Sequence, residues 1–142
     1  MFLTSLWSLY FNENDFYAFI ESGLITTLTA AVLILLSRGE DKKSINLRDG
    51  FYVVTLAWVS MALFSSLPYY QSIYFTNFVD AFFEAMSGIT TTGASVVGSN
   101  SLGYSIEELP HGILFWRSFT QFIGGMGIIL FTIAILPILG MG

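Results

Sequence analysis

The most constraining feature of the sequence is a short polar run that lies between two strongly apolar stretches. Residues 82–95 read FFEAMSGITTTGAS, with three consecutive threonines before a glycine. The run is too short to cross a bilayer, which takes about 20 apolar residues in a helix, and it is too polar to face lipid. Irregular backbone at membrane depth is tolerated only where protein buries it or where it lines an aqueous path. The run therefore indicates a loop in a cation-conducting pore.

The composition predicts an all-α membrane protein. Of the 142 residues, 54% are hydrophobic and 11% are charged, whereas soluble domains carry about 25% charged residues. The chain has no cysteine, which excludes disulfides and thiolate metal sites. It has no basic patch of the kind that nucleic acid requires. The usual phosphate and zinc motifs and any nucleophile–base pair are missing as well, so we expect neither an enzyme nor an organic cofactor.

Three segments are long and apolar enough to be transmembrane helices. They are residues 16–36, residues 51–70, where Pro68 is expected to end the helix, and residues 113–139. The opening residues 1–11 are apolar but amount to half a span. We therefore expect residues 1–37 to form a membrane region whose first helix is truncated.

The basic residues predict the orientation of these spans. Four of the five lie in the connection 38–50, which the positive-inside rule places in the cytoplasm. Residues 1–15 and 71–111 then lie outside. Glu107 and Glu108 either gather cations at the outer mouth or belong to a solvated loop. The four basic residues are Arg38, Lys42, Lys43 and Arg48.

Residues 80–88 are expected to form a re-entrant half-helix that enters from the outer side. Asp80 suits the N-cap or first turn, and Gly88 suits the stop that follows a helix. Nine residues give a helix of about 13 Å, roughly half the hydrocarbon core. Its partially negative C-terminus would then lie near the middle of the membrane, where it favours a cation.

The filter loop is predicted at residues 89–95. The backbone carbonyls of Thr90, Thr91, Thr92 and Gly93 can replace the hydration shell of a monovalent cation. The threonine hydroxyls can bond to the supporting wall, and Gly93 permits a positive φ. The alternative is an ordinary polar loop between two helices.

Two charged residues are candidates for structural support of this loop. Arg117 lies just inside the third span, where charged residues are usually paired, and Glu84 on the half-helix is the nearest partner by topology. We hypothesise a buried Glu84–Arg117 brace. The alternative is that Arg117 reaches the outer interface and Glu84 faces a water-filled vestibule.

Small residues and one histidine complete the set of candidates. Thr120, Gly124 and Gly127 share one face of the third span, which favours close helix packing over a gating hinge. His111 follows Pro110 near the two glutamates of the outer loop. A surface histidine at a helix start is the favoured interpretation, and a metal site is the alternative.

Three stretches closely resemble the TrkH/TrkG family of potassium-uptake membrane subunits. They are residues 82–95 with the sequence given above, residues 109–129 with the sequence LPHGILFWRSFTQFIGGMGII, and residues 47–51 with the sequence LRDGF. The resemblance covers nearly the whole chain, and the two longer stretches are highly specific together.

The resemblance implies a potassium transporter of the inner bacterial membrane, built from four membrane–pore-loop–membrane repeats around one pore. Residues 51–142 would be the first repeat, and the chain would be an N-terminal fragment that supplies one quarter of the selectivity filter. The backbone of Thr91 and Thr92, flanked by Thr90 and Gly93, would hold the transported potassium ion. The implied partners are membrane lipid, the remaining three repeats, a second copy in a homodimer, and a cytosolic nucleotide-binding subunit of the TrkA type.

Other interpretations remain open at this point. The related KtrB subunits lack the helix pair that precedes the first repeat, so residues 16–36 favour the TrkH type over the KtrB type. Four copies of the chain could form one filter, although the leading span argues against this assembly. A non-conducting membrane scaffold with a buried re-entrant loop is the alternative from another class, and a membrane-embedded enzyme has no supporting residues.

Overall fold

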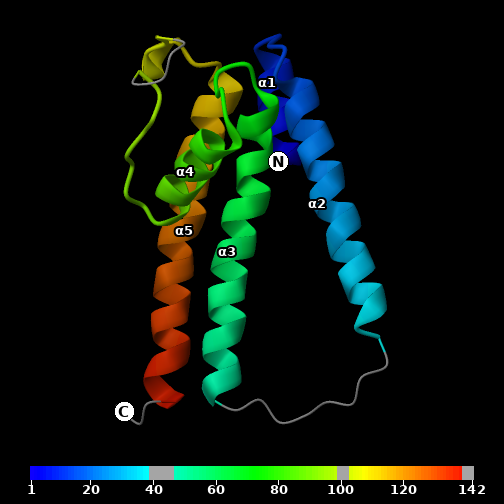
Figure 1. The fold of residues 1–142 in the computed structure, drawn as a ribbon, viewed down its shortest axis with the longest axis vertical. Helices are drawn as coiled ribbons and strands as arrows, with labels where there is room; N and C mark the ends of the chain where they lie inside the picture. Colours follow the sequence, from blue (N-terminus) through cyan, green and yellow to red (C-terminus); the bar gives the residue numbers. More distant parts are fainter. Residues whose placement is uncertain (39–46, 99–102, 139–142) are drawn as a thin grey trace.

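The computed structural model describes residues 1–38, 47–98 and 103–138, and this part of the chain is helical with no β-strand (Figure 1). It contains five α-helices and one 3₁₀ helix. The elements in chain order are α1 (Phe2–Tyr10), α2 (Phe16–Leu36), α3 (Leu47–Gln71), α4 (Phe78–Ile89), η1 (Ile106–Glu108) and α5 (His111–Ile138).

Three of the helices are long and apolar enough to cross a membrane. The apolar segments are Phe16–Leu36, Arg48–Gln71 and His111–Leu130. Large apolar side chains such as Leu28, Leu33 and Leu56 are exposed along them. A helix that is apolar on all sides and exposed is suited to lipid rather than water. The predicted class, an all-α membrane protein, is therefore confirmed.

The bounds of the long helices differ in detail from those expected. α2 begins and ends where the sequence predicted, but α3 begins at Leu47 and continues to Gln71. The prediction that Pro68 ends this helix was wrong. A proline removes only one helical hydrogen bond, and the Pro68 side chain is fully buried within the packed end of α3. α5 begins at His111, two residues earlier than expected, with Leu114 donating to the carbonyl of Pro110.

Several expectations lie outside the described residues. The predicted cytoplasmic connection 38–50 falls largely on residues 39–46, and the end of the third span falls on residue 139. Figure 1 places the end of α2, the start of α3 and the end of α5 at one end of the molecule. The short helices α1 and α4 lie toward the opposite end.

The packed core lies at the end of the molecule that holds α4. Phe19 of α2 meets Trp116 of α5 edge to face, with ring centroids 6.1 Å apart, and the Trp116 indole donates to the carbonyl of Ser65. α4 packs against both α3 and α5. The core therefore fixes the position of the short helix between two long ones. Its buried members are Phe19, Tyr69, Phe75, Ala81, Ala85, Val97, Leu109, Ile113 and Trp116.

Candidate functional site

The site begins with the short helix α4, which is longer than the sequence predicted. It spans Phe78–Ile89, and Asn77 precedes it in extended conformation, with φ −134° and ψ 154°. Asp80 lies in the first turn, where a carboxylate is favourable against the helix dipole. It also accepts a hydrogen bond of 2.9 Å from the Thr76 hydroxyl. Twelve residues give a length of about 18 Å, so α4 is roughly half as long as α3.

Gly88 does not end the helix, which corrects the sequence prediction. It lies inside α4, and the helix is capped by Thr90. The first residue after the helix with a left-handed conformation is not Gly88 but Thr91, with φ 57°. Gly88 is explained by packing, because an added Cβ would lie 2.5 Å from the Thr120 hydroxyl of α5. The glycine allows a close approach between helices and not a turn.

The loop after α4 turns its backbone amides toward the helix it has just left. The N–H of Thr90 donates to Met86 over 2.9 Å, and the N–H of Thr91 donates to Gly88 over 2.9 Å. The amides of the next two residues, Thr92 and Gly93, both donate to the carbonyl of Ser87, over 3.0 and 3.3 Å.

The carbonyl oxygens of the same loop contrast with its amides. Within the described ranges, no group donates a hydrogen bond to the carbonyls of residues 90–93, and all four residues are exposed. Positive φ values at Thr91 and Gly93, 57° and 74°, direct the backbone along this path. The loop therefore presents an exposed row of carbonyls to which none of the described residues donates a hydrogen bond.

Threonine hydroxyls support the loop from within. The Thr90 hydroxyl donates to the Met86 carbonyl over 2.8 Å, and it lies 2.9 Å from the Thr92 hydroxyl. Both contacts stay within the loop and the last turn of α4. The hydroxyls thus tie the threonine run to the end of α4.

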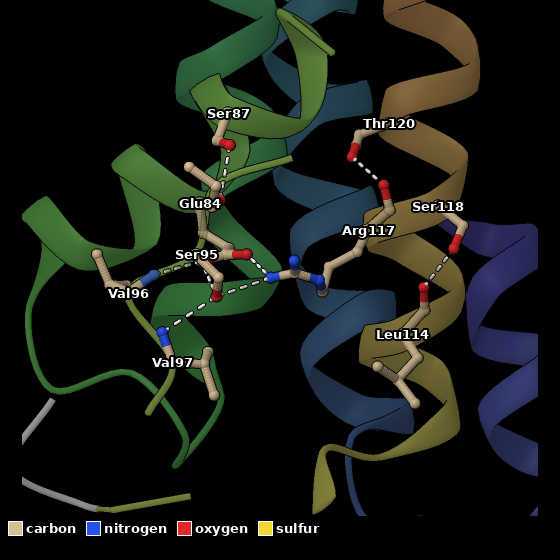
Figure 2. Close-up of polar contacts among 10 residues, drawn as sticks. Glu84, Ser87, Ser95, Val96, Val97, Leu114, Arg117, Ser118 and Thr120 are labelled. Carbon is tan, nitrogen blue, oxygen red and sulfur yellow. Dashed lines mark hydrogen bonds and ion pairs between the residues drawn. The ribbon is translucent and has the colours of Figure 1, made fainter. Parts of the chain in front are cut away.

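The second half of the loop, residues 94–96, is bonded to α4 through the side chains of Ser87 and Glu84 (Figure 2). The Ser87 hydroxyl donates to the carbonyl of Ala94 over 2.7 Å. Glu84 Oε2 accepts from the Ser95 hydroxyl over 3.0 Å and from the backbone N–H of Val96 over 3.2 Å. Both ends of the loop are therefore fixed to the same helix.

Arg117 of α5 joins this group. Its guanidinium forms an ion pair with Glu84 Oε1, and its Nη1 donates to the Ser95 hydroxyl over 3.1 Å (Figure 2). The side chains of Glu84 and Arg117 are 1% and 12% exposed. The structure thus brings together the two residues that the sequence suggested as a brace. The alternative arrangement, with Arg117 at the interface and Glu84 in a vestibule, is not the one in the structure.

Ser95 is the residue that sequence reasoning missed. Its hydroxyl donates to Glu84 and accepts from Arg117 and from the N–H of Val97, the last over 3.1 Å. These three bonds use the full capacity of a hydroxyl group. No spacing rule pairs residue 95 with residues 84 and 117, so the sequence carried no signal for this role.

Close contacts between helices hold α5 against the end of α4. An added Cβ at Gly124 would overlap the carbonyl oxygen of Ile89, whereas Gly125 has only Thr91 Cγ2 near it, at 3.8 Å. Thr120 contacts Gly88, as described above, and an added Cβ at Gly127 would lie 3.9 Å from the Trp58 ring. The small residues on one face of α5 thus permit the close packing that their spacing predicted.

A second polar group lies at the start of α5. Glu13, in the connection between α1 and α2, accepts from the backbone N–H groups of His111 and Gly112 over 2.8 and 2.9 Å. His111 Nδ1 lies 2.8 Å from the same carboxylate. Burial raises the pKa of Glu13, but these hydrogen bonds and the charge of His111 outweigh it and lower the pKa overall. In the part of the chain that the structure describes, no three carboxylate or histidine side chains form a metal site.

Comparison with known proteins identifies relatives across nearly the whole chain. Residues 17–142 match the family described as TrkH, cation transport protein. The Trk system potassium uptake protein TrkH of Halomonas elongata is 40% identical over 95% of this chain, and that of Salmonella typhimurium is 36% identical over all of it. An uncharacterized cation transporter of Methanocaldococcus jannaschii is 37% identical over 91% of the chain.

The chain spans about a quarter of the length of these relatives, between 25% and 28%. The regions of resemblance include α4, the loop that follows it and the whole apolar part of α5. Because the family match extends over residues 17–142, the chain belongs to the TrkH family of cation transport proteins.

Proposed function

We propose that this chain contributes one quarter of a potassium-selective filter, and that residues 90–93 hold the ion through their backbone oxygens. The observation that carries the proposal is the loop of exposed carbonyls for which the described residues supply no donor. A dehydrated monovalent cation needs several such oxygens around it. Four loops of this kind, one from each repeat, would surround an ion that one loop cannot enclose.

The placement of α4 supports the same proposal. Its C-terminus leads directly into the threonine run, so the partially negative end of the helix lies next to the proposed ion. A helix about half as long as the spans, packed between α3 and α5, would end near mid-membrane if it enters from the outer side. Residues 51–142 would then form one membrane–pore-loop–membrane repeat, preceded by the helix region 1–37.

The Glu84–Arg117 pair would keep the loop in shape while ions pass. Both side chains are largely buried; Arg117 bonds to Glu84 and Ser95, and Glu84 accepts from the Val96 N–H as well. Removing one member of such a pair costs about 3–5 kcal/mol. The proposed role of the two residues is structural support, since the side chains of Glu84 and Arg117 are only 1% and 12% exposed.

In the intact protein, transport would be passive conduction across the inner bacterial membrane, driven by the membrane potential at about 2.3 kcal/mol per 100 mV. The proposed partners are the three further repeats of a longer polypeptide, a second copy of it, and a cytosolic regulatory subunit of the TrkA type. The names of the TrkH relatives, which are potassium uptake proteins of Trk systems, support potassium as the ion.

The test uses a chimera in which residues 1–142 replace the matching segment of a full-length TrkH relative, in a strain that cannot otherwise take up potassium. We expect the chimera to restore growth at low potassium and Gly93→Asp to abolish it. Gly103→Asp is the matched control, because Gly103 also has a positive φ, 68°, and nothing lies within 4 Å of its Cβ position.

Two results of the chimera experiment would contradict the proposal. If the Gly93→Asp chimera grows as well as the unmodified one, residues 90–93 do not line the conduction path and the scaffold interpretation replaces the filter. If the unmodified chimera is present in the membrane but never supports growth, the segment is not interchangeable with that of a potassium transporter. Either result would overturn the proposal.

A further inference from the structure

A polar pocket of about 700 Å³ lies at the end of the molecule near the start of α5, apart from the loop of residues 90–93. The α1–α2 connection, the first turns of α2, the end of α3 and the segment 107–111 form its walls. Its volume is within the range of organic ligand sites. Half of the ten acidic residues of the chain line it: Glu13, Asp15, Glu21, Glu107 and Glu108.

Asp15 is the unusual member of this wall. The residue is only 8% exposed, and its Oδ2 has no hydrogen-bond partner in the described parts of the protein. It stands at the N-cap position of α2, yet its side chain does not cap the helix. A buried carboxylate without a donor is costly and is normally paired. Asp15 Oδ2, an atom closed off from solvent, therefore lacks a hydrogen-bond donor among the described residues.

The remaining residues of the pocket do not supply this donor. The only basic side chain on its wall, His111, is engaged with Glu13. Both oxygens of Glu13 are occupied by the start of α5. Burial of Asp15, and to a smaller extent the negative charge of Glu13, raises the pKa of Asp15 to about 6. The pocket thus carries an excess of negative charge that a cationic ligand would relieve.

Size and chemistry decide which cation fits. No three carboxylate or histidine groups converge as metal ligands among the residues described, and the volume far exceeds that of a single metal ion. The acidic groups are instead spread along the walls, and Tyr17 and Tyr74 add aromatic surface between them. Ammonium groups bind well to carboxylates and to aromatic faces. An extended chain with several ammonium groups matches this distribution.

We propose that this pocket binds a linear organic polyamine, with one ammonium group donating to Asp15 and others facing Glu21 and Glu107. The terminal torsion of an aspartate is broad, so a small rotation can present either oxygen of Asp15 to the ligand. The proposal does not depend on the filter assignment, because none of its residues belongs to α4 or to the loop that follows it. It assigns a second cation site to the chain, with a different ligand.

Spermidine binding to the purified chimera, measured by isothermal titration calorimetry, tests the proposal. We expect saturable binding with one site per protomer, and a dissociation constant at least tenfold higher for Asp15→Asn. Asp80→Asn is the matched control, since it removes one carboxylate from the exposed first turn of α4, outside the pocket. It should leave the dissociation constant within a factor of two.

Three results would overturn the proposal. They are the absence of saturable spermidine binding, an unchanged dissociation constant in Asp15→Asn, or Ca²⁺ binding tenfold more tightly than spermidine, which would indicate an inorganic ion site. Should Asp15→Asn fail to give monodisperse protein, Glu21→Gln combined with Glu107→Gln decides in the same way. Both of those side chains are exposed, so their replacement tests the ligand and not the fold.

Discussion

The backbone of Gly124, midway along α5, lies directly against the carbonyl group of Ile89, the last residue of α4. The residue after Ile89 begins the exposed threonine run, so α5 reaches the loop through its backbone at this point. No side chain of any size fits between the two helices there.

Replacing Gly124 by alanine is therefore expected to displace the end of α4. The new methyl group would overlap backbone that cannot rotate away, and overpacking of this kind costs about 1–3 kcal/mol or more. We expect potassium-dependent growth of the chimera to fall at least tenfold. Gly125→Ala is the matched control, because its nearest neighbour outside its own helix is a methyl group at 3.8 Å. Equal growth of the two variants would show that the Gly124 contact is unimportant.

Glu84 and Arg117 are expected to be energetically coupled. Glu84→Gln or Arg117→Gln alone should lower stability by about 3–5 kcal/mol, because each leaves a buried charge without its partner. The double variant should lose less than the sum of the two. A thermodynamic cycle on the thermal unfolding of the purified chimera measures the coupling, which we expect to exceed about 1 kcal/mol. Simple additivity of the two effects would contradict the pairing.

Ser95→Ala should weaken the loop more than its small change in volume suggests. The substitution removes three hydrogen bonds: it takes the acceptor from the Val97 N–H, one donor from Glu84, and one of the two acceptors of Arg117, which keeps Glu84. We expect a loss of about 1–3 kcal/mol in stability and a lower rate of potassium uptake. Ser118→Ala is the control, since that exposed hydroxyl bonds only to the Leu114 carbonyl of its own helix. If the two variants behave alike in uptake assays, the Ser95 bonds do not shape the loop.

Glu13→Gln is expected to destabilise the start of α5. The carboxylate caps two N–H groups there, and the loss of such a cap costs about 0.5–2 kcal/mol. The folded-state pKa of Glu13 is lowered, so its contribution is present above the unfolded pKa and is lost as the pH falls through the folded pKa. The difference in unfolding midpoint between Glu13→Gln and the unmodified chimera should thus be large at pH 7 and small in acid. A difference that grows in acid would have the wrong sign.

Asp15→Asn, unlike Glu13→Gln, is expected to raise the stability of the protein in the absence of any ligand. The folded-state pKa of Asp15 is raised from 3.8 to about 6, so ionisation of Asp15 destabilises the fold above that value and has no such effect at a pH below both values. We expect the asparagine variant to be more stable at pH 7.5, by roughly 1–3 kcal/mol. The advantage should disappear near pH 3.5. A variant that is less stable at neutral pH would show that the Asp15 charge has a partner in the free protein.

The sequence predicted the long helices well because membrane-spanning segments are read from length and apolar content alone. Residues 16–36 were placed without error, and the helix before the threonine run was recognised from the polar interruption. Helix ends were less certain, because Pro68 and Gly88 are usual breakers whose effect depends on packing. Pro68 is buried inside α3, and Gly88 contacts Thr120 across the helix interface.

The candidate site was predictable only in part for a similar reason. A buried charge in an apolar segment demands a partner, so the Glu84–Arg117 contact followed from elementary electrostatics. The contacts of Ser87 and Ser95 did not, since a serine is compatible with any surface and pairs according to three-dimensional position. The acidic pocket also brings together carboxylates up to 95 positions apart, Glu13 and Glu108, which no local pattern records.

The amides of residues 90–93 are all satisfied by the last turns of α4, and the hydroxyls of Ser87 and Ser95 fasten the rest of the loop to that same helix. The hydrogen bonds that curve the loop are thus mostly local, between residues 84 and 97, and Arg117 of α5 adds a distant one through Ser95. In a ring of several such loops, each loop would already have its conformation before the repeats assemble. The positions of the loops in the ring would then depend on how the helices dock. An error in docking would misplace a loop without unfolding it.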